Sequence, residues 1–318
     1  MSKLAFVFPG QGSQTVGMGM DVAEKYPAAE KIFKTADKVL GFSLADMIKN
    51  GPEEDLKITV NTQPAIVTTS IALLEVLRGQ GFTCNATAGH SIGEYSALYC
   101  AGVLTLEDAL MLTRARGEYM NEAGEDNPGT LAAIIGVDKE KMEEICHKTA
   151  SETGETVVVA NINCPGQIVI SGNHQSVEKA GEMASEAGAK KVIPLAVSAA
   201  FHSPLMNKAA DKLAKKLNKV TFSDAKIPVY SNVTGTMVTD GDKLRDLMKQ
   251  QIISQVQWEK SVNMMKSDGI DTFVEIGPGK ALAGMIKRID RKADVHNFNG
   301  LAALDRIMKK IGPEMVAI

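Results

Sequence analysis

The sequence predicts an α/β protein built around a largely parallel sheet. Short runs with strand character alternate along the chain with longer segments of helical periodicity, which is typical of strand–helix–strand units. A glycine-rich loop follows the first of these runs. The 318 residues are 44% hydrophobic and 23% charged, proportions from which a core of ordinary size can form.

The first 127 residues contain strands and helices in turn. Leu4–Phe8 is a short apolar run that we expect to be a buried strand. Pro64–Leu77 is a strong helical pattern, with Pro64 expected in the first turn, where a missing N–H costs nothing. The other elements expected here are helices through about residue 50, a strand at Ala86–Ala88, and helices at Ile92–Cys100 and Leu106–Met120.

Residues 128–197 follow a different pattern, after the turn-rich segment 124–129. The expected elements are, in order, strand Thr130–Val137, helix Lys139–Ala150, strands Thr156–Asn161 and Gln167–Ser171, helix Val177–Ala187 and strand Lys191–Val197. The order βαββαβ is that of the ferredoxin-like unit. We therefore expect a small ferredoxin-like subdomain at 128–197, inserted into a larger α/β domain of residues 1–127 and 198–318 that has a late strand at Thr272–Ile276.

A candidate nucleophile lies at the end of the second predicted strand. Residues 89–93, GHSIG, match G-x-S-x-G, in which small residues flank a serine because the strand-to-helix turn leaves no room for side chains. Ser91 is therefore a candidate nucleophile, and the Ile92 amide at the helix start could stabilise an oxyanion. The same residues also match the capping box S-x-x-E, in which Ser91 would only cap a helix with Glu94 as its partner.

His202 is the best candidate base among the five histidines. Ser203 and Pro204 resemble an N-cap and a first-turn proline of a helix over Leu205–Leu217. The positive end of that helix would keep the imidazole neutral, as a general base requires. The alternative is a loop histidine with a structural role. No Asp or Glu stands out as the third member of a catalytic triad with Ser91 and His202. A backbone carbonyl could orient the imidazole ring instead. His90 is expected to pack against the turn or hold it.

Arg116 is a candidate substrate-binding residue. It lies on the apolar face of its helix, whereas Arg114 points elsewhere. A buried arginine needs an anionic partner, either a structural carboxylate of the protein or a substrate carboxylate held bidentately. The loop Pro9–Gln14 lacks the third glycine of a dinucleotide motif and the lysine of a phosphate loop. It still allows close approach to a ligand, with Gln11 as an oxyanion or orienting group.

Composition excludes several other classes of function. The net charge of −3 gives no basic footprint for nucleic acid, and the basic run 287–292 is short. No stretch approaches the roughly 20 apolar residues of a membrane span. The four cysteines are scattered without a CxxC pair, which argues against disulfides and a zinc site. We therefore expect a cytoplasmic protein without a metal.

Six blocks in this order resemble the malonyl-CoA:acyl carrier protein transacylase family over nearly the whole chain. They are FVFPGQGSQ at 6–14, NTQPA at 61–65, GHSIGEYSAL at 89–98, ARGEYM at 115–120, AFHSPLM at 200–206 and EIGPGKAL at 275–282. The resemblance implies an α/β-hydrolase-like core with a ferredoxin-like insert. It also implies transfer of a malonyl group from malonyl-CoA to an acyl carrier protein, with coenzyme A thioester as substrate and no cofactor.

The resemblance also assigns roles to residues. Ser91 would form the acyl-enzyme, His202 would activate it, and Arg116 would pair with the malonyl carboxylate. The oxyanion hole would combine Gln11 with the Ile92 amide. The other matched positions are Gln251, whose carbonyl would orient the histidine, Gln63 and Asn163 near the pocket, and Phe201, which crowds a methyl branch. Residues from about 300 to 318 match no block and receive no role.

Two rival functions use the same residues. A hydrolase with the same serine and histidine is one; the buried arginine and the missing acid argue against it. A non-catalytic scaffold in a synthase assembly is the other. For a stand-alone enzyme of this kind a monomer is the simpler expectation.

Overall fold

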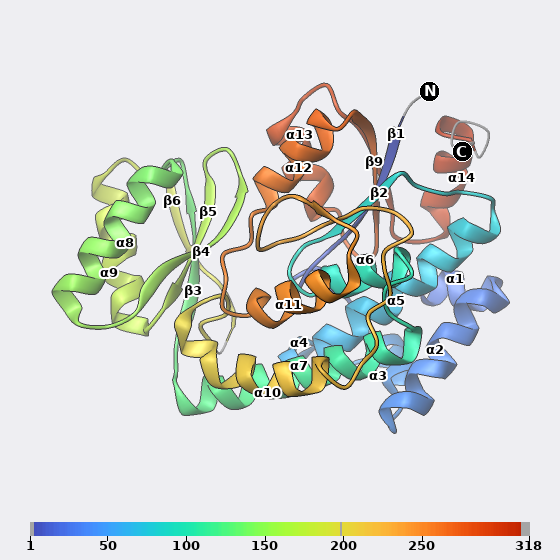
Figure 1. The fold of residues 1–318 in the computed structure, drawn as a ribbon, viewed down its shortest axis with the longest axis horizontal. Helices are drawn as coiled ribbons and strands as arrows, with labels where there is room; N and C mark the ends of the chain where they lie inside the picture. The colour runs from blue at the N-terminus through green and yellow to red at the C-terminus, as the bar shows by residue number, and fades with distance from the viewer. Residues whose placement is uncertain (1–2, 198, 313–318) are drawn as a thin grey trace.

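The computed structural model describes residues 3–197 and 199–312, and within them two sheets organise the chain (Figure 1). The larger sheet has the order β10-β9-β1-β2-β7-β8, and all its pairs are parallel except β7 with β8. Its strands are β1 (Lys3–Phe8), β2 (Ala86–Gly89), β7 (Val229–Tyr230), β8 (Met237–Val238), β9 (Ile270–Ile276) and β10 (Asp294–Phe298). The mixed α/β architecture with a parallel sheet agrees with the sequence prediction.

Helices pack around this sheet and bury its apolar strands. They are α1 (Met20–Lys25), α2 (Pro27–Leu40), α3 (Leu44–Asn50), α4 (Glu53–Lys57), α5 (Thr59–Gly79), α6 (Gly93–Cys100), α7 (Leu106–Asp126), the 3₁₀ turn η1 (Pro204–Met206), α10 (Asn207–Leu217), α11 (Gly241–Gln251), α12 (Trp258–Ser267), α13 (Ala281–Ile289) and α14 (Leu301–Lys310). Because α7 continues to Asp126, the turn-rich boundary expected at 124–129 is shorter than predicted and begins at Asn127.

Helix α5 is the central helix of the larger unit. Within the described residues it alone is long and apolar enough to cross a membrane, contrary to the expectation that no stretch approaches that length. However, 83% of its most apolar window is buried inside the protein, where it packs against α2 and α7. Its apolar surface is therefore covered by the protein core.

The predicted start of α5 at Pro64 is wrong, because the helix begins five residues earlier at Thr59. Pro64 has no N–H to donate to the carbonyl of Val60, four residues before it. That carbonyl instead accepts a hydrogen bond from Arg114 Nη1 of α7 at 3.3 Å. A side chain from a neighbouring helix thus makes an internal proline tolerable.

The smaller sheet has the order β4-β5-β3-β6 and is antiparallel throughout. Its elements are β3 (Thr130–Ile135), α8 (Lys139–Thr153), β4 (Val157–Cys164), β5 (Gln167–Gly172), α9 (His174–Glu186) and β6 (Lys191–Pro194). Both helices lie on the side away from the parallel sheet (Figure 1). Strand β6 ends at Pro194, three residues earlier than predicted.

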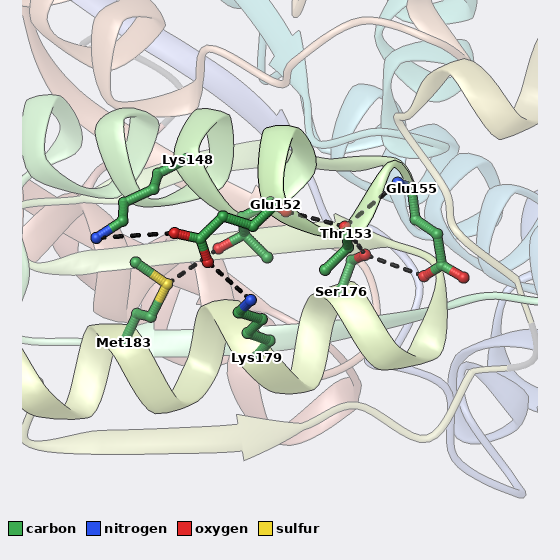
Figure 2. Close-up of polar contacts among 8 residues, drawn as sticks. Lys148, Glu152, Thr153, Glu155, Ser176, Lys179 and Met183 are labelled. Atoms are coloured by element: carbon green, nitrogen blue, oxygen red, sulfur yellow. Dashed lines mark hydrogen bonds and ion pairs between the residues drawn. The ribbon is translucent and has the colours of Figure 1, made fainter.

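Apolar side chains under α8 and α9 form a core separate from that of the larger unit. Figure 2 shows polar contacts that join the two helices. Glu152 of α8 pairs with Lys179 of α9 at 2.7 Å, and the hydroxyls of Thr153 and Ser176 are 2.9 Å apart. The sheet also contacts the larger unit, where α12 and α13 pack against β4. A parallel bridge between Asn161 and Val256 links the two units.

Candidate active site

Ser91 lies in a tight turn between β2 and α6. Its φ of 51° is in the left-handed region, which is uncommon for a residue other than glycine. A Cβ on Gly89 would lie 2.0 Å from the carbonyl of Gly93, and one on Gly93 would lie 2.3 Å from the carbonyl of Phe8. Only glycine fits at either position, which is the physical reason for the G-x-S-x-G pattern.

The hydroxyl of Ser91 faces an imidazole. Ser91 Oγ lies 2.7 Å from His202 Nε2, although the two residues are 111 positions apart in the chain. The capping-box alternative is wrong, because the N-cap of α6 is Ile92 and no side chain caps that helix. Glu94 is also engaged elsewhere, with Asn232 and Gln251.

The orientation of the His202 ring is fixed by main-chain carbonyls. Nδ1 lies 2.9 Å from the carbonyl oxygen of Gln251 and 3.1 Å from that of Ser254. Because both can only accept, Nδ1 carries the proton and Nε2 presents a lone pair to Ser91. His202 itself has a φ of 56°, and it is 4% exposed.

The His202 imidazole is held neutral by its surroundings. Burial, followed by the positive charge of Arg116, lowers its pKa from 6.5 to about 3. From the sequence we expected the start of a helix to keep the imidazole neutral. Ser203 does cap η1, because its hydroxyl accepts from the Leu205 N–H at 3.3 Å. That turn is a single 3₁₀ turn, with α10 beginning only at Asn207, and burial and Arg116 are the stronger causes.

Arg116 extends from α7 to the serine. It is 1% exposed, and its Nη2 lies 3.2 Å from Ser91 Oγ and 3.1 Å from Gln251 Oε1. Nη1 donates to Gln63 Oε1 at 2.8 Å, while Nε has no partner among the described residues. No carboxylate of residues 3–197 or 199–312 lies within ion-pair distance of this guanidinium, so no direct ion pair to the protein is present there; the negative charge of Glu94 acts on it from farther away. Arg114 instead pairs with Glu118 at the surface.

A cavity of about 390 Å³ opens beside these groups. The positions singled out in the sequence that line it are Gln11, Gln63, Ser91, Ile92, Arg116, Asn163, Phe201 and His202. Gln251 lies behind the wall and is 1% exposed. The small sheet supplies part of the wall through Leu131, Ala133, Asn161, Asn163, Gln167 and Val169.

Two further positions make specific contacts at this cavity. Gln11 Nε2 donates to Thr59 Oγ1 at 3.1 Å, which leaves the second N–H of that amide and the Gln11 main-chain N–H for a ligand. Asn163 Oδ1 lies 2.8 Å from His90 Nε2, and the His90 ring packs edge-on against Trp258. His90 thus ties the turn at Ser91 to the small sheet, as expected of a residue that holds the turn.

Sequence reasoning missed Asn232 and Ser254. Asn232 Oδ1 accepts from Ser91 N at 2.6 Å, and its Nδ2 donates to the Gly89 carbonyl at 2.6 Å, so this side chain holds both sides of the turn. The only local signal was the turn-rich segment 231–235. Ser254 contributes a carbonyl, which no residue type reveals.

The fold and the site together define a class. The site has a serine hydroxyl beside a neutral imidazole, at a turn whose Ile92 N–H has no partner among the described residues. These groups are typical of enzymes that transfer an acyl group through a serine ester, either to another acceptor or to water.

Comparison with known proteins narrows this class. The acyl transferase domain family matches residues 5–308. A malonyl CoA-acyl carrier protein transacylase of Bacillus subtilis (strain 168) is 48% identical over 292 residues, 92% of either chain. An acyl carrier protein S-malonyltransferase from Vibrio cholerae O1 biovar eltor str. N16961 has a TM-score of 0.92 and 42% identity, covering 96% of this chain and 100% of that chain. A malonyl-transacylase solved with a type II PKS acyl-carrier protein has a TM-score of 0.93 and 39% identity, covering 98% and 99%.

The chain therefore belongs to the acyl transferase domain family and, within it, to the malonyl CoA-acyl carrier protein transacylases.

Proposed function

We propose that the protein transfers a malonyl group from malonyl-CoA to the phosphopantetheine thiol of an acyl carrier protein through a malonyl ester on Ser91. The observation that carries the proposal is the state of Arg116. Its guanidinium is buried, has only neutral partners within hydrogen-bond distance, and lies 3.2 Å from the serine oxygen. A buried cation without an anionic partner is costly, so a substrate carboxylate is its natural complement.

The first half-reaction acylates the serine. His202 Nε2 takes the proton of the Ser91 hydroxyl as its oxygen attacks the thioester carbonyl. The N–H groups of Ile92 and Gln11 stabilise the resulting oxyanion. The C–S bond then breaks, His202 returns the proton to the sulfur, and coenzyme A leaves as the thiol. The carbonyl of Gln251 selects the required tautomer of the neutral imidazole and keeps the ring oriented while Nε2 carries the serine proton.

The second half-reaction runs the same steps with another thiol. His202 takes the proton from the phosphopantetheine sulfur, which attacks the malonyl ester. Ser91 leaves with that proton. Arg116 holds the carboxylate in both halves, while Gln63 fixes the guanidinium. Asn163 and Phe201, which line the cavity, would shape it around the acyl group, and the bulk of Phe201 would crowd a methyl branch.

Intact-mass spectrometry after brief exposure to malonyl-CoA tests this proposal. We expect one malonyl adduct, absent from Ser91→Ala and discharged faster by holo acyl carrier protein than by water. Arg116→Ala should lose malonylation but keep acetylation from acetyl-CoA, whereas the control Arg114→Ala on the same helix should keep both. Adduct loss to water alone would favour the hydrolase, absence of any adduct the scaffold, and full malonyl selectivity in Arg116→Ala would refute the carboxylate role.

The same proposal covers the architecture and the setting. Residues 128–197 would form a ferredoxin-like subdomain, which the βαββαβ order and the antiparallel sheet order β4-β5-β3-β6 support. Residues 1–127 and 198–318 would form an α/β-hydrolase-like catalytic domain; residues 1–2, 198 and 313–318 lie outside those described. We further propose a cytoplasmic monomer that uses no cofactor or metal and binds neither nucleic acid nor membranes.

A further inference from the structure

Glu94 is a buried carboxylate that the proposed chemistry leaves unused. It lies in the first turn of α6, three residues after Ser91, and is 1% exposed. Burial raises its pKa to about 7, against the opposing effects of the Gln251 amide, the Asn232 N–H and the charge of Arg116. A carboxyl group is costly in such a place unless its partners use it, so those partners indicate its role.

We propose that Glu94 is a positioning residue for malonyl recognition, which fixes the orientation of the Arg116 guanidinium through the side-chain amide of Gln251. The inference rests on the proposed function and adds to it a residue that contacts neither substrate nor nucleophile hydroxyl.

The argument begins with the amide of Gln251. Its Nε2 lies 2.7 Å from Glu94 Oε2 and 2.9 Å from the Ser91 carbonyl oxygen. The Ser91 carbonyl and the ionised Glu94 carboxylate can only accept, so the NH₂ group must point toward them. The amide oxygen is thereby turned to the other side, where Arg116 Nη2 donates to it at 3.1 Å. Glu94 and the Ser91 carbonyl together therefore decide which end of the amide meets the guanidinium.

Replacing the carboxylate by an amide would weaken this control, because only the Ser91 carbonyl would be certain to hold the NH₂ group. Glu94 accepts from Gln251 Nε2 and from the Asn232 N–H at 3.2 Å, and a hydrogen bond from the Ser231 side chain also lowers its pKa. A glutamine at this position has one oxygen, so its NH₂ would face one of those donors. The Gln251 amide could then rotate and present its own NH₂ to Arg116, which would keep only Gln63 and the serine oxygen as acceptors.

Glu94 also contacts the turn that holds Ser91, so a loss of malonyl transfer alone would not show which role was lost. Asn232, whose N–H Glu94 accepts, also binds the Ser91 N–H. Glu94 could thus support the turn as well as the arginine. Transfer of an uncharged acyl group reports on the turn alone, because it does not need Arg116. The ratio of malonyl to acetyl transfer therefore isolates the effect on the guanidinium.

The experiment measures kcat and KM for acylation by malonyl-CoA and by acetyl-CoA. For Glu94→Gln we expect the KM for malonyl-CoA to rise about tenfold, the value of one charge-assisted hydrogen bond, with acetyl transfer changed less than about threefold. The matched control is Glu275→Gln: Glu275 is a fully buried carboxylate that accepts from the N–H groups of Leu282 and Ala283 in α13 and from the side chain of Asn297. The Glu275→Gln variant should have a lower melting temperature and an unchanged ratio of malonyl to acetyl transfer.

A double-mutant cycle with Gln251→Ala, which keeps the carbonyl for His202, tests the route. If Glu94 acts through Gln251, the double variant should match Gln251→Ala in KM within about twofold. The inference would be overturned if the increases in KM of the two single variants multiplied in the double variant. It would also be overturned if Glu94→Gln slowed malonyl and acetyl transfer equally, or left the malonyl-to-acetyl ratio unchanged. Should Glu94→Gln not fold, Glu94→Asp replaces it, with an intermediate rise in KM expected and an unchanged KM as the contrary result.

Wild-type protein and Arg116→Ala in the same assay separate the two proposals. If the wild-type chain does not transfer malonyl, or Arg116→Ala keeps its preference for malonyl, the proposed function fails. If both behave as expected and Glu94→Gln keeps the wild-type ratio, only the role of Glu94 fails.

Discussion

The buried imidazole of His202 makes a prediction about folding stability as the pH falls. Its pKa is lowered from 6.5 to about 3 in the folded protein, first by burial and then by Arg116. The unfolded chain binds this proton below about pH 6.5, whereas the folded state resists it until about pH 3. The stability contributed by neutral His202 is therefore present above pH 6.5 and is lost as the pH falls through the window down to about 3.

The size of the effect follows from those two values. Between pH 7 and pH 5 the unfolded state gains about 2 kcal/mol from protonation at this position, and the folded state gains almost nothing. The test compares wild-type protein with His202→Asn. Asparagine tolerates the left-handed backbone at φ 56° and can donate to the Gln251 carbonyl, so the fold should be kept.

Urea unfolding at pH 7 and pH 5, at constant ionic strength, gives the four free energies. We expect the wild-type protein to lose about 2 kcal/mol more than His202→Asn over this interval. His90, whose pKa is also lowered by burial, is present in both proteins and cancels in the comparison. Equal losses in the two proteins would refute the reasoning that the folded structure excludes the proton.

Three other substitutions test single contacts. Gly93→Ala places a Cβ 2.3 Å from the Phe8 carbonyl, so it should cost about 2 kcal/mol in urea unfolding and abolish the malonyl adduct by mass spectrometry; a normal adduct would contradict the tight-turn argument. Arg114→Ala removes the donor to the Val60 carbonyl and should cost about 1 kcal/mol in thermal or urea unfolding, unless solvent replaces it without loss. Asp138→Ala removes the cap on Lys141 N and should also cost about 1 kcal/mol, measured by urea unfolding, with activity unchanged.

The sequence predicted the alternation of elements well because apolar periodicity and glycine turns are local. Strand β1 at Lys3–Phe8 and strand β9 at Ile270–Ile276 lie where short apolar runs indicate them. Pro64 was misplaced because its rule is also local: a proline usually opens a helix. Here Arg114, fifty residues later on another helix, takes the carbonyl that the proline leaves free, and no pattern around Pro64 contains that information.

The site illustrates the same limit. Ser91 and Glu94 satisfy the capping-box pattern and the nucleophile pattern with the same letters. Only the partner 111 residues away, His202, distinguishes the hydroxyl's orientation. The contacts of Asn232 and Ser254 depend on where loops meet after folding, so residue type gave no warning of them. The roles assigned to the residues around the cavity stay predictions until the variants are measured.

The division of the cavity wall has a practical consequence. The groups proposed to break and form bonds come from the larger unit, whereas residues of β3, β4 and β5 close the opposite side within one continuous stretch of chain. The shape of that side of the cavity could therefore be changed by exchanging this stretch, with Arg116, Phe201 and the reaction centre retained in the larger unit. A graft would have to keep several polar junctions in register: the tie between His90 and Asn163, the bridge between Asn161 and Val256, and the hydrogen bond from Arg288 to Gln167.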